Sequence, residues 1–97
     1  MFMVITKYVK DIEEVDRWLP AHSAFLDRYY ARKKVIFSGR RNPRTGGAIL
    51  FRVDERAELD AILAEDPFRI NGVTECEVCE IIPTKYDEAF AIFAERT

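Results

Sequence analysis

The sequence predicts a small α+β domain, in which four strands alternate with two helices and a further helix follows near the C-terminus. Runs with apolar residues at alternate positions indicate the strands, and longer runs with apolar residues three and four positions apart indicate the helices. Turn-forming residues separate the runs. The chain has 97 residues, 48% hydrophobic and 33% charged, which suffices for one compact core but not for two ordinary domains. We therefore expect a single domain over residues 1–97 with a core over about 2–83.

The first strand and the first helix open the chain. Residues 2–9 alternate and carry apolar side chains on both faces, so both faces of this strand need cover. Asp11 can cap a helix, and helical spacing then continues over 12–33. Pro20 interrupts this run, which predicts either a kinked helix or a short helix followed by a longer one that begins at Pro20.

A hairpin is expected next. Residues 35–39 and 47–53 read as strands, and the segment between them is rich in turn formers and arginine. This pattern predicts an antiparallel pair with a basic tip.

The second helix and the fourth strand complete the core. Asp54 is the expected N-cap of the helix, which must end by Asp66 because Pro67 disfavours helical geometry in the residue before it. A turn at 71–72 then leads into a strand over 73–82.

A last helix, over about 85–95, is expected after Pro83, with Thr84 as its cap. Tyr86, Phe90 and Phe93 would share one face of it.

The order strand, helix, strand, strand, helix, strand is the split βαβ arrangement of ferredoxin-like folds, with an antiparallel four-stranded sheet. Two helices cover only one face of such a sheet, and the strands are apolar on both. A second copy of the sheet is the simplest cover, so we expect a homodimer, with the C-terminal helix packed on the partner subunit or on the dimer seam.

Charge and hydropathy exclude several classes of partner. The net charge of -2 argues against nucleic-acid binding, which requires a basic face. No apolar run approaches the roughly 20 residues that span a bilayer, and the N-terminus lacks the basic region of a secretory signal. We expect a cytoplasmic protein that binds neither membranes nor nucleic acid.

Cys76 and Cys79 have the spacing of redox and zinc motifs, but they lie in the predicted fourth strand. Residues three apart on a strand point to opposite faces, so these thiols should not share a metal ion or form a disulfide. Buried apolar thiols are the expectation.

His22, the only histidine, lies on the apolar stripe of the first helix. A histidine can take or give a proton near neutral pH, whereas the structural alternative is a core histidine with a hydrogen-bond partner. Asp66 would end the second helix, where its charge opposes the helix dipole, so it needs a partner or a turn before Pro67. If both helices cross the same face of the sheet, the two side chains can meet and transfer protons.

Other polar residues are weaker candidates than this pair. Ser23 lies about 100° round the helix from His22 and should point elsewhere, while Ser38 could reach the site from the neighbouring strand. Tyr29 and Tyr30 read as helix packing. With a single histidine and no clustered acids at ligand spacing, we expect no metal and no cofactor.

Arginines of the hairpin could bind an anion, or they could form a solvated tip. Arg40, Arg41 and Arg44 are the candidates, and Arg40 is the strongest because it directly follows Ser38 and Gly39.

The ordered set of these residues resembles the YCII-related (YciI-like) family over roughly residues 2–83. The similarity rests on His22 with Phe25-Leu26, Ser38-Gly39, Gly46-Gly47, Asp66-Pro67-Phe68 and Gly72-Val73. The resemblance implies a ferredoxin-like fold of the dimeric α/β-barrel type and an active site centred on His22 and Asp66. One branch of the family is implicated in dehydrochlorination of a chlorinated hydroxyquinol, and related barrels include muconolactone isomerases. The family's usual Ser-Gly-Pro is Ser38-Gly39-Arg40 here, and Lys34 replaces the usual glycine before the second strand, so the pocket rim differs.

The sequence thus supports two hypotheses. In the first, a lyase or isomerase uses His22, held by Asp66, to move a proton on a cyclic or aromatic substrate, whose anionic character stays open; Ser38, Arg40 and Phe68 are then the candidate substrate-binding residues. In the second, a noncatalytic dimeric module binds a metabolite or a protein. A solvent-reachable cavity at His22 would favour the first, and a sealed histidine the second.

Overall fold

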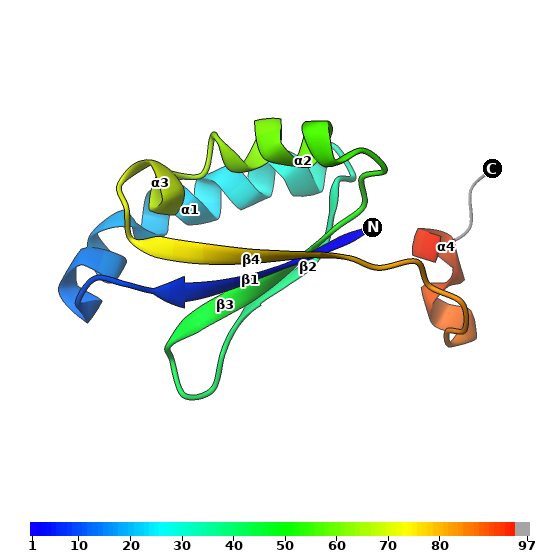
Figure 1. Ribbon diagram of the computed structural model, residues 1–97, viewed down its shortest axis with the longest axis horizontal. Helices are drawn as coiled ribbons and strands as arrows, with labels where there is room; N and C mark the ends of the chain where they lie inside the picture. Colours follow the sequence, from blue (N-terminus) through cyan, green and yellow to red (C-terminus); the bar gives the residue numbers. More distant parts are fainter. Residues whose placement is uncertain (95–97) are drawn as a thin grey trace.

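A computed structural model of the chain describes residues 1–94 and has the predicted split βαβ arrangement (Figure 1). The four strands form one sheet in the order β2-β3-β1-β4, and each neighbouring pair is antiparallel. The strands are β1 (Phe2–Tyr8), β2 (Val35–Arg40), β3 (Gly46–Phe51) and β4 (Thr74–Glu80). The fold class predicted from the sequence is confirmed, and the strand ends differ from the predicted ones by no more than two residues.

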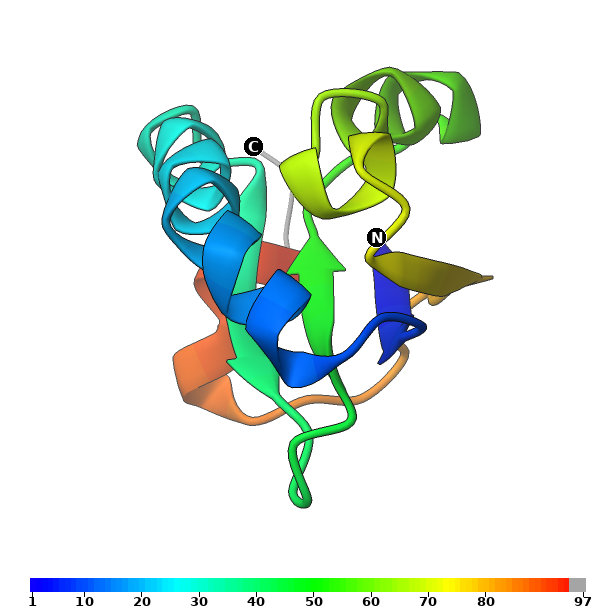
Figure 2. The same cartoon turned by 90° about the vertical axis from the view of Figure 1, so that its left-hand side faces the viewer.

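Helices α1, α2 and α3 lie on one face of the sheet (Figure 2). Helix α1 (Ile12–Ala31) connects β1 to β2, and α2 (Arg56–Leu63) and α3 (Pro67–Ile70) follow β3. The core lies between these helices and the sheet. Its fully buried side chains include Val4, Phe25, Phe51, Leu59 and Leu63.

Helix α1 begins as predicted, because the Asp11 side chain accepts a hydrogen bond from the Glu14 backbone at 3.1 Å. The alternative of two helices is wrong, since α1 runs without a break through Pro20. Proline removes one backbone donor and strains the preceding turn. Here the buried side chains Val15, Phe25 and Tyr29 lie on both sides of it along one stripe. Their packing keeps the two halves in one helix.

The predicted cap of α2 is wrong. Glu55, not Asp54, occupies the N-cap position, and its side chain makes no capping hydrogen bond. The predicted stripe is correct, because Leu59, Ile62 and Leu63 are buried. Burial of these side chains therefore compensates for the missing cap.

The hairpin of β2 and β3 contains two local constraints. A Cβ atom at Gly46 would lie 1.9 Å from the carbonyl oxygen of Thr6, so only glycine fits beside β1 there. The pairing of β2 with β3 is irregular between Val35 and Phe37, where β2 has one additional residue. Downstream of this bulge, Ser38 pairs with the buried Ile49 and Arg40 with Gly47. Both residues of β2 therefore face the helices.

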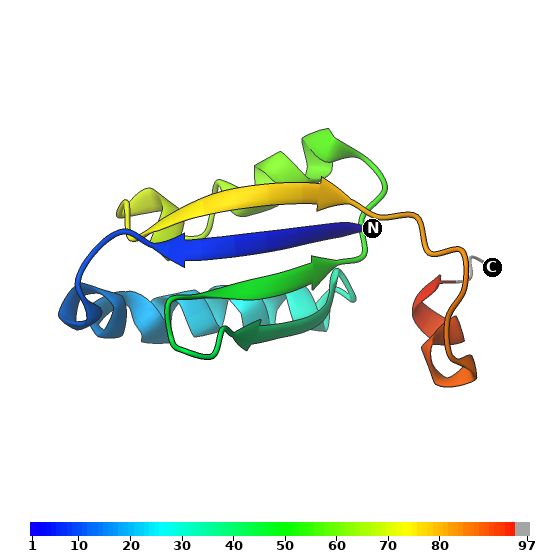
Figure 3. The same ribbon diagram turned by 60° about the horizontal axis from the view of Figure 1, so that its bottom comes forward.

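The other face of the sheet carries no helix (Figure 3). One row across this helix-free face consists of Phe37, Leu50, Met3 and Cys79, which pair in that order. Lys7 and Glu75 form a charged pair of positions at its far end. Cys79 thus lies on the helix-free face and Cys76 on the other, as the spacing predicts. Both thiols are exposed, so the expectation of buried thiols is wrong; β4 is an edge strand and leaves them uncovered.

The C-terminal segment extends beyond the end of the sheet (Figure 1). It contains a short 3-10 helix η1 (Glu88–Phe90) and α4 (Ala91–Ala94), and Asp87, not Thr84, caps it. The predicted helix over 85–95 is therefore shorter and starts later, and residue 95 lies outside the described part. Among residues 1–94, no helix has the length and hydropathy to cross a membrane.

Candidate functional site

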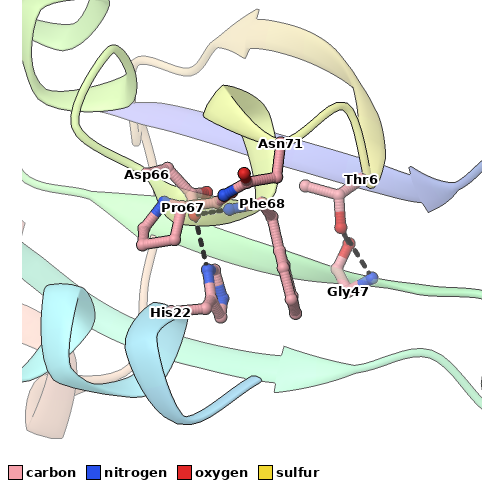
Figure 4. A network of polar contacts seen from close by, with 7 residues as sticks. All are labelled: Thr6, His22, Gly47, Asp66, Pro67, Phe68 and Asn71. Carbon is pink, nitrogen blue, oxygen red and sulfur yellow. Dashed lines mark hydrogen bonds and ion pairs between the residues drawn. The ribbon is translucent and has the colours of Figure 1, made fainter. Parts of the chain in front are cut away.

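His22 and Asp66 meet on the helix-covered face of the sheet, as the sequence predicts (Figure 4). The Nδ1 atom of His22 lies 2.7 Å from Oδ1 of Asp66. The side chains are 12% and 2% exposed, so the pair is largely shielded from water. Nδ1 is engaged by the carboxylate, and Nε2 is the ring nitrogen left for a ligand.

Asp66 does not end the second helix, contrary to the sequence-based interpretation. It is the N-cap of α3, and its Oδ1 accepts a hydrogen bond from the Phe68 backbone at 3.0 Å. Helix α2 already ends at Leu63. The sequence predicts that this carboxylate has either a partner or a turn before Pro67, and the structure has both. One buried oxygen therefore begins α3 and holds the imidazole, which fixes the ring relative to the backbone.

Phe68 fixes the face of the same imidazole. The two rings stack with centroids 4.1 Å apart and an interplanar angle of 12°. Tyr8 meets the Phe68 ring edge-on, with centroids 6.1 Å apart. The imidazole is thus restrained both in its plane and on one face, and a ligand can approach only from the remaining directions.

A cleft of about 190 Å³ lies beside the imidazole, between α1, α3 and the end of the sheet. Its lining includes His22, Phe68, Thr6 and the β2 residues Ser38 and Arg40. Exposed residues such as Leu19 lie at its rim, so the cleft is open to solvent. Part of its lining is apolar, as in most small-molecule sites.

The side chain of Ser38 is held by a residue that sequence reasoning assigned to packing. The Tyr30 hydroxyl lies 2.7 Å from Oγ of Ser38, so α1 orients this serine. Ser23 also belongs to the lining of the cleft, so the expectation that it points elsewhere is wrong. No hydrogen bond joins Ser23 to His22 within the described part of the chain.

Thr6 is a residue of the cleft that the sequence analysis did not identify, although the pattern of β1 indicates it. Phe2, Val4 and Thr6 share the buried phase of β1, and Thr6 is the polar member of this series. Its Oγ1 accepts a hydrogen bond from the Gly47 backbone at 2.8 Å, which joins β1 to β3 on the cleft wall (Figure 4). A polar residue at an otherwise apolar position of a strand indicates either a structural hydrogen bond or a ligand site. Thr6 makes such a hydrogen bond and also lines the cleft.

The three arginines of the hairpin separate in the structure. Arg40 ends β2 and lines the cleft, and Arg41 does not line it. Arg44 is bound to Asp16 of α1 at 2.6 Å and is only partly exposed, so the solvated-tip interpretation is wrong for this residue. Within residues 1–94, no group of three histidine, cysteine or acidic side chains could hold a metal ion.

The comparisons with known proteins address the fold and the family. The 5-chloro-2-hydroxyhydroquinone dehydrochlorinase TftG from Burkholderia phenoliruptrix AC1100, solved in complex with 2,5-dihydroxybenzoquinone, superimposes with a TM-score of 0.69. It is 18% identical, and the match covers 84% of this chain and 93% of that one, which shows a shared fold. A search of the curated proteins found no match. The model of the YCII-related domain matches residues 1–82, so the family resemblance is confirmed and the chain belongs to the YCII-related domain family.

Proposed function

We propose that the protein is a small-molecule enzyme of the lyase or isomerase type, in which His22, held by Asp66, moves a proton on a cyclic or aromatic substrate. The observation that carries the proposal is an imidazole with one nitrogen bound to a buried carboxylate and with its ring in an open cleft. A packing histidine needs no such opening. The alternative, a noncatalytic binding module, does not explain why the carboxylate fixes the orientation of the imidazole ring.

The proposed chemistry follows from the two ring nitrogens. Nδ1–H donates to Asp66, so Nε2 carries the lone pair that accepts a proton from the substrate. The imidazolium formed in this step is stabilised by the carboxylate, and it returns the proton to another atom of the substrate or to a leaving group. Asp66 is a positioning residue in this scheme because it does not line the cleft.

The cleft favours a ligand of about one ring. Its volume of about 190 Å³ lies below the roughly 300 Å³ at which drug-sized pockets begin. Ser38 and Arg40 supply a hydroxyl and a cation for oxygen atoms of such a ring, and Phe68 supplies an apolar wall. The structurally similar dehydrochlorinase was solved with 2,5-dihydroxybenzoquinone, a single ring with oxygen substituents.

Proton exchange tests the proposal without knowledge of the product. A library of hydroxylated aromatic compounds and unsaturated lactones, with 2,5-dihydroxybenzoquinone included, is incubated with the protein in D2O and followed by proton NMR. We expect at least one compound to lose a carbon-bound proton signal faster with wild-type protein than with His22→Gln. Arg41→Ala, which alters a neighbouring side chain outside the cleft, should exchange like wild type. If a compound binds with His22-dependent affinity but none exchanges, the binding-module alternative is correct.

We also propose that the chain forms a homodimer through the helix-free face. Phe37 on this face is 45% exposed, which is unusual for a large aromatic side chain in a strand. Phe37→Lys should convert the protein to a monomer in sedimentation velocity, while Ile70→Lys, a change of an exposed apolar residue on α3, should leave the mass unchanged. Equal masses for wild type and Phe37→Lys would contradict this assembly.

A further inference from the structure

A second cavity lies at the opposite end of the sheet from the His22 cleft. It has a volume of about 750 Å³, within the range of sites for metabolites. The cavity lies where α1 and β3 end, beside the N-terminal residue and the C-terminal segment. The chemistry proposed above does not use it.

The charge of this second cavity contrasts with that of the whole chain. The chain has a net charge of -2. The cavity nevertheless has more cationic than acidic side chains in its lining, namely Arg32, Lys33, Lys34 and Arg52 against Asp54 and Glu80. Such a local excess of positive charge attracts anions.

The remaining wall of the second cavity is apolar. Ile81, Ile82 and Pro83 follow β4 along one side, and Phe93 of α4 lies on another. Ile82 is 76% exposed, so part of this wall is open to water. Cations on one side and apolar side chains on the other suit a ligand that has both an anionic head and an apolar body.

Lys33 is the residue that general helix physics does not explain. Cations after a helix are stabilised by the helix dipole, which accounts for Arg32 and Lys34. Lys33, however, has a φ of +61°, a conformation in which a helix end usually has glycine or asparagine. A lysine at this position strains the backbone, and Arg32 and Lys34 already interact favourably with the helix dipole without it.

Two of the neighbouring cations already interact with other side chains, whereas Lys33 is available to a ligand. Lys34 binds Glu58 at 2.8 Å, and the guanidinium of Arg32 lies over the Tyr29 ring at 4.9 Å from its centroid. Lys33 has no ion-pair partner among residues 1–94 and lines the cavity. Its charge is thus presented where an anionic head would enter.

We propose that the second cavity binds a small organic anion, with its carboxylate or phosphate group beside Lys33 and its apolar body against Ile81 and Phe93. This site is separate from the His22 cleft and takes a ligand independently of the reaction proposed there. Both parts of the ligand are needed, because an exposed lysine alone binds weakly.

An amide-resolved titration tests the proposal. The full 15N-labelled chain is titrated with phenyl phosphate, benzoate, inorganic phosphate and phenol. We expect phenyl phosphate or benzoate to shift the amides of Lys33, Val53 and Ile81, and the better of the two identifies the head group. Inorganic phosphate and phenol should bind at least about fivefold more weakly, since each lacks one part.

Lys33→Asn separates binding from folding. Asparagine adopts the left-handed conformation readily, so the Tm should stay equal or rise. The affinity for the better anion should fall about fivefold, and Lys33→Arg should restore it. Lys10→Asn, which removes an exposed lysine far from this cavity, is the control.

Three results would overturn the inference: unchanged amides around Lys33 with shifts only near Ser38, equal affinity of Lys33→Asn and wild type, or equal binding of phenol and benzoate. Because the amides of the two cavities are distinct, a failure here leaves the proposal for His22 standing or falling on its own test.

Discussion

At the scale of single residues, Asp66 combines two tasks in one carboxylate. Oδ1 accepts hydrogen bonds from the Phe68 backbone and from His22, and the side chain is only 2% exposed. A buried carboxylate is tolerated only where such partners satisfy it. The stability of α3 and the orientation of the imidazole are therefore linked.

Substitution of Asp66 should separate the two tasks. Asp66→Ala removes the helix cap and the bond to His22, and we expect the free energy of unfolding to fall by about 2 kcal/mol. Asp66→Asn retains an oxygen for the Phe68 backbone and should cost less than half as much. Urea unfolding at neutral pH measures both. Equal losses would mean that the cap contributes little.

Arg40 is expected to determine whether the cleft prefers anions. Because it lines the cleft and Arg41 does not, Arg40→Ala should weaken binding of an anionic ring compound about fivefold, whereas Arg41→Ala should not. Arg44→Ala is a poor comparison, since it breaks the bond to Asp16. Shifts of the Ser38 and Ala48 amides on titration with benzoate and neutral benzyl alcohol measure the effect at this cleft, apart from any binding in the second cavity. Selectivity for benzoate at these amides that survives Arg40→Ala would assign the preference to another residue.

At the scale of elements, two polar contacts seven residues apart on α1 hold the segment between α2 and α3. His22 binds Asp66, and the Tyr29 hydroxyl donates to Glu65 at 2.5 Å. Glu65 and Asp66 are adjacent in the chain. The second contact should therefore restrain the backbone that presents Asp66.

Removal of this contact has an expected dependence on pH. The hydrogen bond to Glu65, followed by burial, raises the pKa of Tyr29 above its usual value of 10.0. A raised pKa means that the stabilisation is fully present below about pH 10 and is lost as the pH rises through the folded-state pKa. Tyr29→Phe should therefore cost about 1 kcal/mol at neutral pH and progressively less above pH 10. Urea unfolding from pH 7 to 11 measures the difference in unfolding free energy between wild type and Tyr29→Phe. Tyr30→Phe, the same change at the next residue, is the control. A loss for Tyr29→Phe that stays constant with pH would contradict the assignment.

The sequence predicted elements better than it predicted their ends. The stripe of Leu59, Ile62 and Leu63 identified α2 without help from its cap, since periodicity is a property of many residues. Its N-cap was misassigned because Asp54 and Glu55 are both acidic, and only tertiary packing decides where the helix begins. The sequence left open whether Pro20 kinks or divides the helix, because local propensity disfavours proline, whereas the buried residues on either side keep α1 continuous.

The sequence identified the residue types of the candidate site but not all of the contacts that hold them. His22 and Asp66 stand out by residue type, but the bond between Tyr30 and Ser38 depends on how α1 crosses β2, which no local pattern encodes. The second role of Asp66 was likewise hidden, because α3 has only four residues and leaves no periodic signal. Contacts between segments that are distant in the sequence depend on tertiary packing, so local sequence patterns do not predict them.

At the scale of the whole molecule, the C-terminal segment carries an aromatic series that its own domain covers poorly. Tyr86 and Phe90 have ring centroids 6.2 Å apart, and Phe90 and Phe93 have theirs 5.6 Å apart. Tyr86 is 40% exposed, and Ile92 on the same segment is 71% exposed. Burial of each large apolar side chain contributes on the order of 1.5–3 kcal/mol, so contact with a second copy is favoured.

Truncation after Pro83 tests this role. We expect the shortened chain to dissociate at higher protein concentration than the full chain in sedimentation equilibrium, because the aromatic series no longer contributes to the dimer. Circular dichroism should remain that of a folded domain, since the core lies within residues 2–80. A truncated protein that dimerises as tightly as the full chain would show that the segment serves another purpose.

The additional residue in β2 has a consequence for how this strand can change in length. Val35 pairs with Phe51 before the bulge and Phe37 pairs with Leu50 after it, so deletion of the codon for Ile36 would leave a regular ladder with the same partners. Ser38 would stay opposite Ile49 and Arg40 opposite Gly47, and both would still face the cleft. The strand could thus lose one residue in a single genetic step while its ligand-binding side chains stay in place.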